Sequence, residues 1–583
     1  MTKTLLGILR KYKKGSILTI LLSVLEAAFE ILIPLRMADL IDQGIEPGEM
    51  AAVWKLGTII LVFAVLQLLT GVLSAHVAAK TSVGFSANLR QDMYDNVQTF
   101  SFSNIDKFST ASIVTRLTTD VTNIQNAYQM LIRMAVRGPV MLVFSMIVSF
   151  RINTTIALIF LAVIPIMAVL LLLIIRKVGP FFNRVFRTYD TLNNVVQENV
   201  RGIRVVKSFN QEDHEIKKFK GISQSIYEDF AAGERLLAFN SPIMQFFMYA
   251  CMILISWIGA KAIVASGNSA ALGMTTGDLT ALFSYATQIL MALMMLSMVF
   301  TMIIISLASA HRIAEVLEEK TDIANPTGAE MTVRDGSIRF EQVSFAYAAK
   351  ADKKVLSDID LSIASGQTVG IIGGTGSSKS SLVQLIPRLY DVSSGQLLLG
   401  GVDVRKYDLD VLRNAVAMVL QKNELFSGTI KENLRWGNET ATDEEIEEAC
   451  RLACADEFIQ SFPDKYDTYI EQGGANVSGG QKQRLCIARA LLKKPKVLIL
   501  DDSTSAVDTK TDASIQKSFA EFIPDTTKII IAQRVSSVQH ADLIVVMDEG
   551  KIVATGRHEE LLKTCDIYKE VYESQKKGDR DHE

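Results

Sequence analysis

Residues 368–381 read Thr-Val-Gly-Ile-Ile-Gly-Gly-Thr-Gly-Ser-Ser-Lys-Ser-Ser. The apolar run at 369–372 predicts a buried strand, the glycines and serines predict a tight loop, and the apolar residues after Lys379 predict a helix. A loop of this kind presents backbone N–H groups to a phosphate. The stretch therefore predicts an α/β domain with a phosphate-binding loop, whose candidate residues are Gly373, Gly374, Thr375, Gly376, Ser377, Ser378, Lys379, Ser380 and Ser381.

Ser378 departs from the phosphate-loop pattern, which has glycine before the lysine. A serine keeps its N–H but restricts the backbone. On its own, the loop leaves open both a phosphate site and an ordinary strand-to-helix turn. In a phosphate site, Lys379 would neutralise the β- and γ-phosphates and Ser380 would bind Mg²⁺.

The surrounding sequence favours the phosphate site. Residues 336–575 alternate short β-rich runs (369–373, 497–501, 528–532 and 543–547) with helical stretches, which is typical of an α/β domain. The run at 497–500 ends in Asp501, as expected for a Walker B strand, whose terminal aspartate reaches Mg²⁺ through water. A second candidate anion site, the predicted helix start Val477, Ser478, Gly479, Gly480 and Gln481, lies just before it. One nucleotide site does not need two anion-binding segments. Two such segments are expected if two domains pair head to tail and each helix start closes over the other domain's phosphates.

The remainder of the chain predicts a membrane domain. The 583 residues are 49% hydrophobic and 21% charged, with a mean hydropathy of +0.25, and the long apolar runs precede residue 320. A bilayer core of ~30 Å needs ~20 apolar residues per helix. We expect spans at about 15–37, 56–78, 130–151, 152–175, 238–262 and 281–307, hence a transmembrane domain at 1–310, a linker at 311–335 and a polar tail at 576–583.

Charge predicts the orientation and excludes some partners. The N-terminus is basic and the loop after the first span is acidic, so the N-terminus and, after six spans, the nucleotide domain should be cytoplasmic. A net charge of −3 gives no basic surplus for a nucleic-acid partner. The five cysteines form no CxxC pair, which favours a reducing compartment. The two long cytoplasmic loops are polar and helix-compatible, so each predicts paired helical extensions ~35–40 Å long.

These motifs together resemble the ATP-binding cassette exporters in which six spans are fused to one nucleotide-binding domain. The resemblance implies an all-α six-helix transmembrane domain with long intracellular helical loops, followed by an α/β P-loop ATPase domain. It implies ATP and Mg²⁺ as cofactors, Tyr347 stacked on adenine, Mg²⁺ held by Ser380, Gln421 and Asp501, and a D-loop containing Ser505 and Asp508. It also implies coupling elements near 104–107 and 210–213 at the ends of the two long loops.

Two positions differ from the family pattern and bear on mechanism. In the family, a glutamate follows the Walker B aspartate and a histidine senses the γ-phosphate, whereas this chain has Asp502 and Gln533. Aspartate is shorter by about 1.5 Å, and a 1 Å misplacement can cost on the order of 10²-fold in rate. Glutamine cannot carry the charge of an imidazolium. The helix start at 477–481 matches the family's signature motif and is nearly intact. We therefore expect this chain's own ATP site to be weakened and a partner's ATP site to be competent.

This combination resembles the heterodimeric bacterial multidrug exporters. We therefore predict an efflux subunit of the bacterial plasma membrane. Its partner would be a second half-transporter with an intact Walker B glutamate and an altered signature. Alternatives are half of a lipid or peptide exporter, and a regulatory ATP-binding subunit without transport of its own.

Two groups in the spans are candidates for substrate contact. The sixth span carries Met291, Met295 and Met298, whose soft side chains suit hydrophobic drugs but also suit ordinary packing or lipid contact. Glu26 and Glu30 lie one turn apart on the first span. They either attract cationic amphiphiles or pair with Arg133 and Arg137.

Overall fold

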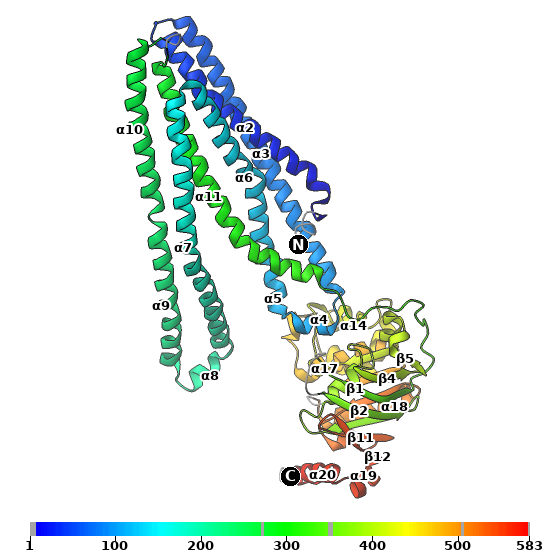
Figure 1. Cartoon of the computed structure of the whole chain (residues 1–583). Coiled ribbons are helices and arrows are strands. Elements are labelled where there is room, and N and C mark those ends of the chain that lie inside the picture. Colours follow the sequence, from blue (N-terminus) through cyan, green and yellow to red (C-terminus); the bar gives the residue numbers. More distant parts are fainter. Residues whose placement is uncertain (1–6, 270–272, 348–353, 503–506, 581–583) are drawn as a thin grey trace. The chain divides into compact units, whose positions relative to one another are not determined.

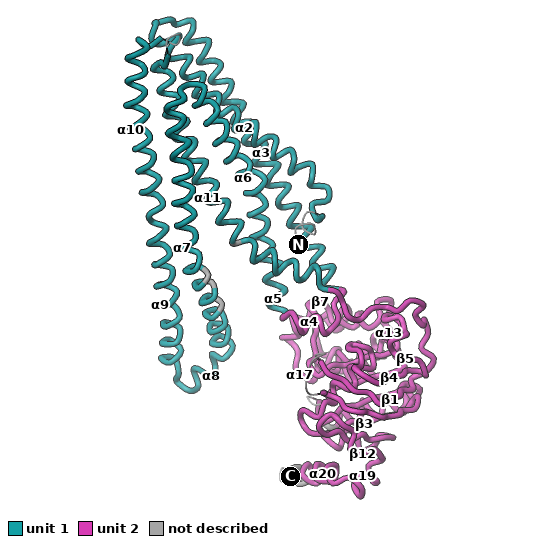
Figure 2. The backbone as a smooth tube through the Cα atoms, viewed as in Figure 1, with its two compact units in different colours: residues 1–98, 110–319 teal, residues 99–109, 320–583 magenta. Residues whose placement is uncertain are grey.

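The computed structural model describes residues 7–269, 273–347, 354–502 and 507–580. The chain divides into two compact units (Figure 2): residues 1–98 and 110–319 form unit 1, and residues 99–109 and 320–583 form unit 2. The segment 99–109 thus belongs to unit 2, although the chain on both sides of it belongs to unit 1.

Unit 1 is built from long helices (Figure 1). Over the described residues, six helical segments are long and apolar enough to cross a membrane, as predicted. They are formed by α2 (Lys13–Leu40), α3 (Met50–Gln98), α6 (Val121–Ile152), α7 (Thr154–Arg201), α9 (Glu212–Leu237) with α10 (Asn240–Ser266), and α11 (Thr276–Glu318). Shorter helices extend or connect them: η1 (Arg10–Tyr12), the π-helical η2 (Ile41–Ile45), α5 (Thr110–Thr115), the π-helical η3 (Arg116–Asp120) and α8 (Ile203–Ser208).

Several helices are much longer than a bilayer requires. α3 has 49 residues and α7 has 48, which corresponds to about 70 Å of helix. α7 and α9 lie side by side and are connected through α8 (Figure 1), so the second long loop forms paired helical extensions. α11 continues to Glu318, inside the segment predicted as a linker, because Ile313, Ala314 and Val316 are buried at helical spacing.

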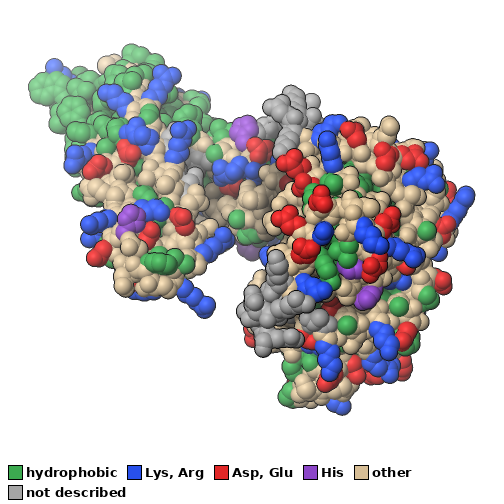
Figure 3. All heavy atoms as spheres, turned by 90° about the horizontal axis from the view of Figure 1, so that it is seen from below, with side chains coloured by type: hydrophobic (Ala, Val, Ile, Leu, Met, Phe, Trp, Pro, Cys, Tyr) green, Lys and Arg blue, Asp and Glu red, His purple; other side chains and the backbone are tan. Residues whose placement is uncertain are grey.

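Large apolar side chains are exposed along unit 1. Leu61 and Leu68 on α3 are each 64% exposed, and Ile253 and Val264 on α10 are 68% and 83% exposed. Figure 3 shows hydrophobic side chains gathered over part of unit 1, whereas charges of both signs are dispersed over the visible face of unit 2. Exposed apolar surface of this extent is typical of a lipid-embedded domain.

Unit 2 contains two larger sheets. A six-stranded sheet has the order β12-β11-β3-β10-β9-β6, with every neighbouring pair parallel except β11 and β12. Its strands are β3 (Thr368–Gly373), β6 (Val416–Val419), β9 (Val497–Asp501), β10 (Thr527–Ile531), β11 (Leu543–Asp548) and β12 (Lys551–Gly556). An antiparallel sheet contains β1 (Ile338–Phe345), β2 (Leu356–Ile363), β4 (Ser394–Leu399) and β5 (Val402–Asp403), and β7 (Gly428–Thr429) pairs with β8 (Tyr469–Ile470). The predicted α/β fold is confirmed.

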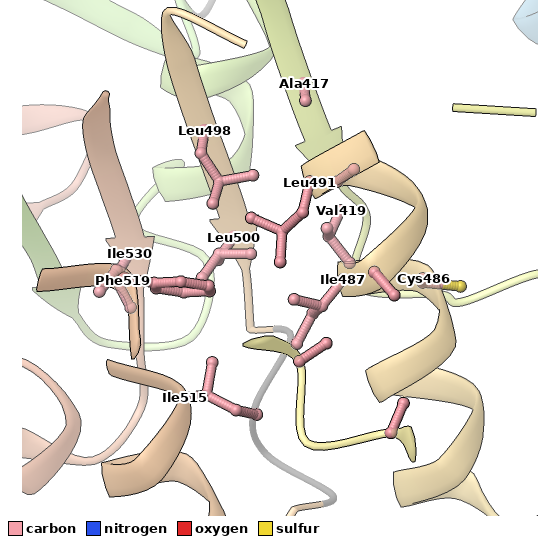
Figure 4. Packing of buried hydrophobic residues seen from close by; sticks show 14 of the residues in the cluster. Ala417, Val419, Cys486, Ile487, Leu491, Leu498, Leu500, Ile515, Phe519 and Ile530 are labelled. Atoms are coloured by element: carbon pink, nitrogen blue, oxygen red, sulfur yellow. The ribbon is translucent and has the colours of Figure 1, made fainter. Parts of the chain in front are cut away.

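The helices of unit 2 pack on these sheets or on one another. They are α4 (Phe102–Lys107), α12 (Lys379–Gln384), η4 (Val404–Lys406), α13 (Leu409–Ala415), α14 (Ile430–Arg435), α15 (Asp443–Leu452), α16 (Asp456–Gln460), η5 (Lys465–Asp467), η6 (Gln472–Gly474), α17 (Gly479–Leu492), α18 (Thr509–Phe522), η7 (Val535–Ser537), α19 (His558–Thr564) and α20 (Asp566–Arg580). Figure 4 shows how α17 and α18 pack on the parallel sheet: Ile487 and Phe519 point toward Leu500 of β9, which is 1% exposed. This packing fixes the strand ends that carry the candidate site.

The last helix, α20, extends into the predicted polar tail at 576–583 and ends at Arg580. Residues 581–583 lie outside the described part. Tyr568 of α20 is fully buried, and Val571 and Tyr572 pack against the same core as α17 and α18. Because this apolar face anchors the helix, its polar end can continue as regular turns.

Candidate nucleotide-binding site

The topology of the parallel sheet assembles the site. β3, β10 and β9 are neighbours and run in the same direction, and Ile531 aligns with both Ile371 and Asp501. The phosphate loop after β3, Asp501 at the end of β9 and Gln533 after β10 therefore meet at one edge, where ligands bind in open α/β sheets. Segments more than 100 residues apart in the sequence converge there.

The loop keeps a tight geometry despite the serine at position 378. A Cβ on Gly373 would lie 2.2 Å from the carbonyl oxygen of Met547, so this position requires glycine. Ser378 has φ 69° and ψ 24°, in the left-handed region, where an L-residue pays about 1–2 kcal/mol. The chain thus adopts the conformation that glycine favours without having a glycine at that position.

Lys379 and Ser380 are oriented toward the candidate phosphate region. The Lys379 ammonium donates to the carbonyl oxygens of Gly373 and Gly374, both at 2.9 Å, and to Ser377 Oγ at 3.2 Å. Burial lowers the pKa of Lys379, and the carboxylates of Asp501 and Asp502 oppose that shift. The lysine therefore lies in a partly dehydrated position, in which an anion would gain from its charge.

Ser380 and Asp501 form an oxygen pair suited to Mg²⁺. Ser380 Oγ donates to Asp501 Oδ1 at 3.0 Å, and Asp501 is only 3% exposed. Burial raises the pKa of Asp501, which the hydrogen bond from Ser380 opposes. A hydroxyl and a buried carboxylate are donors that Mg²⁺ favours, and a cation there would offset the cost of the buried charge. The residues present therefore fit the expected metal.

Asp502 and Gln533 contact each other. Gln533 Nε2 donates to Asp502 Oδ2 at 2.7 Å, and Asp502 has φ 50°, again in the left-handed region. Burial raises the pKa of Asp502, while hydrogen bonds from Gln533 and Gln421 oppose the shift. Gln533 and Gln421 therefore both bind the carboxylate of Asp502, so the two residues that differ from the family pattern are in contact.

Tyr347 lies beside the loop as part of an aromatic group. Its hydroxyl lies 2.8 Å from Ser381 Oγ, and the residue is 48% exposed. It packs edge-on against Tyr390, with ring centroids 5.1 Å apart. The Tyr390 hydroxyl donates to Asp106 Oδ2 at 2.7 Å, and the Tyr390 ring lies 6.0 Å from that of Phe102.

Phe102 and Asp106 belong to α4, so the candidate adenine residue connects through Tyr390 to the short segment of unit 2 at residues 99–109. Ser101 also donates to the Asp322 carboxylate, and Asn104 Nδ2 donates to the carbonyl oxygen of Lys320 at 3.2 Å. The resemblance places a coupling element here. Sequence reasoning missed Tyr390 and Asp106, because nothing in their spacing marks them as a pair.

The signature segment forms a regular helix start. Ser478 accepts from the Gln481 N–H at 3.3 Å, and Gln481 Oε1 accepts from the Ser478 N–H at 2.9 Å, which makes a capping box for α17. Ser478 and Gly479 are exposed, so the first N–H groups of α17 are accessible to an anion. Asp508 caps α18 by accepting from the Thr511 N–H at 3.0 Å, whereas Ser505 lies outside the described residues.

In the membrane unit, the two glutamates contact arginine. Arg137 donates to Glu26 Oε1 at 2.9 Å and also binds Glu30, while Arg133 lies 3.8 Å from Glu26. Of the two alternatives predicted for these carboxylates, the structure has the ion pairs. Of the three candidate methionines, Met291 and Met298 on α11 are 63% and 64% exposed, and Met295 is partly buried.

Comparison with known proteins agrees with this architecture. Residues 16–294 match the ABC transporter transmembrane region, and residues 356–505 match the ABC transporter domain. An uncharacterized ABC transporter ATP-binding protein of Bacillus subtilis, YfiB, is 37% identical over 573 residues, covering 98% of each chain. The ATP-dependent lipid A-core flippase of Desulfotalea psychrophila is 33% identical over 497 residues, covering 84% of each.

A solved structure has the same fold. The ATP-bound structure of a bacterial Atm1-family ABC exporter superposes with a TM-score of 0.81 at 23% identity, covering 98% of this chain and 99% of that one. The six apolar helices and the sheet-containing ATPase domain account for this likeness. The chain therefore belongs to the ABC transporter family, as an exporter half-transporter that joins one transmembrane region to one ATPase domain in an integral membrane protein.

Proposed function

We propose that this chain is one subunit of a heterodimeric, ATP-driven multidrug exporter of the bacterial plasma membrane, with its N-terminus and ATPase domain in the cytoplasm. Its own Walker residues form the weakened nucleotide site. Its signature, residues 477–481, closes over the partner's competent site. Hydrolysis then occurs mainly on the partner's Walker residues.

The contact between Asp502 and Gln533 carries this proposal. A carboxylate that accepts a hydrogen bond from a neutral amide at 2.7 Å is a poorer base for an attacking water than a free glutamate in the same place. The amide also adds no positive charge near a γ-phosphate. Both effects weaken hydrolysis and leave the main contacts for ATP binding, Lys379 and the phosphate loop, in place.

We assign the remaining ligands by position. ATP lies with adenine on Tyr347 and its phosphates in the loop at 373–381, and Mg²⁺, which neutralises phosphate charge, is held by Ser380, Gln421 and Asp501. The hydrogen bond between Ser380 and Asp501 at 3.0 Å supports this set. Asp508 forms the D-loop at the subunit contact together with Ser505, which lies outside the described residues.

The signature supports a role in the partner's site. Its exposed N-terminus and its complete capping box keep the geometry for binding an anion. A homodimer would combine two good signatures with two poor Walker sites. A partner with an intact Walker B glutamate and an altered signature resolves this mismatch.

We assign substrate contact to the exposed face of α11. Met291 and Met298 present flexible, polarizable side chains that can repack around hydrophobic or cationic amphiphilic compounds. Glu26 and Glu30, in contrast, both pair with Arg137 within the helix bundle, and Arg133 lies 3.8 Å from Glu26. We therefore assign these two carboxylates to the stability of the bundle.

Lipid export is a second candidate, because a relative 33% identical to this chain is named as a lipid A-core flippase. To separate the two, the chain is co-purified with its partner from native membranes, the second polypeptide is identified, and the complex is reconstituted in vesicles. ATP-dependent accumulation of a cationic dye supports multidrug export. Movement of a headgroup-labelled lipid without the dye supports the flippase, and movement of neither supports a regulatory subunit.

Substrate contact at the exposed face of α11, which carries Met291 and Met298, can be tested in the same vesicles. Met298→Ala is expected to change the ranking of dyes by their transport rate. Leu68→Ala on α3 removes an equally exposed apolar side chain, 64% in both cases, and serves as the matched control. Equal effects of the two substitutions would argue against substrate contact at α11.

A further inference from the structure

The segment that carries Gln533 is held by a residue of the last helix. Gln575 of α20 donates from Nε2 to the carbonyl oxygen of Gln533 at 2.8 Å, and its Oε1 accepts from the Val535 N–H, also at 2.8 Å. One partner is an acceptor and the other a donor, so a single orientation of the amide satisfies both. The side chain thus binds the backbone on both sides of Arg534.

Gln575 is itself well supported. It follows Val571 by four residues and Tyr572 by three, so all three side chains lie on one face of α20. Val571 and Tyr572 pack on the core of unit 2, and the buried Tyr568 hydroxyl lies 2.8 Å from His558 Nδ1. The helix face that presents Gln575 is therefore fixed by packing.

The same segment is also held by α18. Ser537 donates to Asp512 Oδ2 at 2.9 Å, and Gln516 donates to the carbonyl oxygen of Ser537 at 2.8 Å. Val535 is 1% exposed. Residues 533–537 thus lie in a frame of hydrogen bonds from two helices, and within it the Gln533 side chain reaches Asp502 at 2.7 Å.

We infer that Gln575 is a positioning residue for Gln533: by holding the backbone at 533–535, it sets the amide of Gln533 where it detects the γ-phosphate of ATP. The inference rests on the proposed function in one respect, the assignment of Gln533 to the γ-phosphate. It extends the nucleotide machinery to the C-terminal helix. It also predicts that the chain distinguishes ATP from ADP less well without Gln575.

The test uses the full-length chain in lipid nanodiscs and measures the affinities for MgATP and MgADP separately. Gln575→Met keeps the length of the side chain and the helix propensity but removes both hydrogen bonds. We expect MgATP affinity to fall roughly threefold to tenfold, from the loss of interactions of ordinary hydrogen-bond strength. MgADP affinity should change by less than about twofold, because ADP has no γ-phosphate.

Ser574→Ala, at an exposed neighbouring position of α20, is the matched control and should change neither affinity. In the double variant with Gln533→Ala, the effect of Gln575→Met on the ATP to ADP ratio should disappear, because the two residues act through one contact. Equal losses of both nucleotides in Gln575→Met would indicate a merely structural role and overturn the inference, as would no loss at all.

The same experiment separates this inference from the proposed function. If Gln533→Ala lowers the ATP to ADP ratio and Gln575→Met does not, the positioning role fails while the assignment of Gln533 stands. If Gln533→Ala leaves the ratio unchanged, the assignment fails and the inference fails with it.

Discussion

Two surfaces of unit 2 differ in how closely they follow the family pattern. One is the Walker edge, where the phosphate loop, Asp501, Asp502 and Gln533 meet, and the other is the signature at the start of α17. At the Walker edge, Ser378 and Asp502 both adopt left-handed backbone conformations, and Gln533 binds the carboxylate that would activate water. At the signature, Ser478 and Gln481 form a complete capping box. In our account, the chain has kept the surface that serves its partner and relaxed the one that serves its own hydrolysis.

The difference between the two surfaces is tested most strongly by substituting one residue of each surface in turn within the heterodimer. Ser478→Ala should lower the maximal rate of ATP hydrolysis by roughly 10²-fold, as does the loss of a donor that acts in the transition state. Asp502→Asn in the same complex should change it by less than about twofold, because its site contributes little turnover. Steady-state hydrolysis by the reconstituted complex measures both.

Ser518→Ala, at a partly exposed serine of α18, controls for the loss of a hydroxyl. Thermal unfolding of each variant separates the loss of the helix cap, about 1 kcal/mol, from the loss of activity. A larger effect at Asp502 than at Ser478 would reverse our assignment of the two surfaces.

A second test restores the Walker edge. The double variant Asp502→Glu with Gln533→His, made in the chain without its partner, should raise ATP hydrolysis at least about tenfold, because the carboxylate regains its reach and the imidazole can carry charge. Each single variant should gain less than the pair, since the two side chains are in contact. No gain from the double variant would place the defect at Ser378, because in the chain alone the signature that faces this site is the chain's own.

Much of the fold could be predicted from the sequence because its signals are local and strong. Runs without charge at 56–75 and 281–310 predict spans, and the apolar runs at 369–373 and 497–501 predict strands that the structure confirms within one residue. The parallel order of β3, β10 and β9 then brings Asp501 to the phosphate loop.

The rest depends on contacts between residues far apart in the chain. The hydrogen bond of Tyr390 with Asp106 spans 284 positions. That of Gln575 with Gln533 joins the last helix, next to the predicted polar tail, to the segment after β10. Local pattern carries no information about such pairs. The pairing of Glu26 and Glu30 with Arg137 was one of two open alternatives, because charge alone does not specify which faces of α2 and α6 meet.

A smaller effect is expected at Ser378. Ser378→Gly relieves about 1–2 kcal/mol of left-handed strain and costs about 0.4–1 kcal/mol through the more flexible unfolded chain. The net result is a gain in the free energy of unfolding of roughly 0.5–1 kcal/mol. Ser518→Gly, in the helix α18, should instead destabilise by roughly 0.5–1 kcal/mol. A loss at both positions would mean that the phosphate loop does not need the left-handed conformation.

The smallest effects concern pH and have opposite signs at two aspartates. Burial raises the pKa of Asp501, so its charged form costs stability at neutral pH, and this cost disappears as the pH falls through the raised pKa. Asp501→Asn should therefore raise the melting temperature of the nucleotide-free chain at pH 7.5, with a gain that shrinks on acidification.

Hydrogen bonds from Thr511 lower the pKa of Asp508, so its charged form contributes stability above the ordinary aspartate pKa, and that contribution is lost as the pH falls through the lowered pKa. Asp508→Asn should lower the melting temperature slightly at pH 7.5, and this loss should vanish on acidification. Shifts of the same sign at both positions would contradict the environments assigned to them.

The most direct measurement compares ATP hydrolysis by the purified chain alone with hydrolysis by the chain bound to its native partner, at equal protein concentration in lipid nanodiscs. Our account predicts slow hydrolysis by the chain alone and rapid hydrolysis by the pair, which a glutamine at the partner's Walker B glutamate would abolish. Brisk hydrolysis by the chain alone would contradict the assignment of Asp502 and Gln533 to a weakened site.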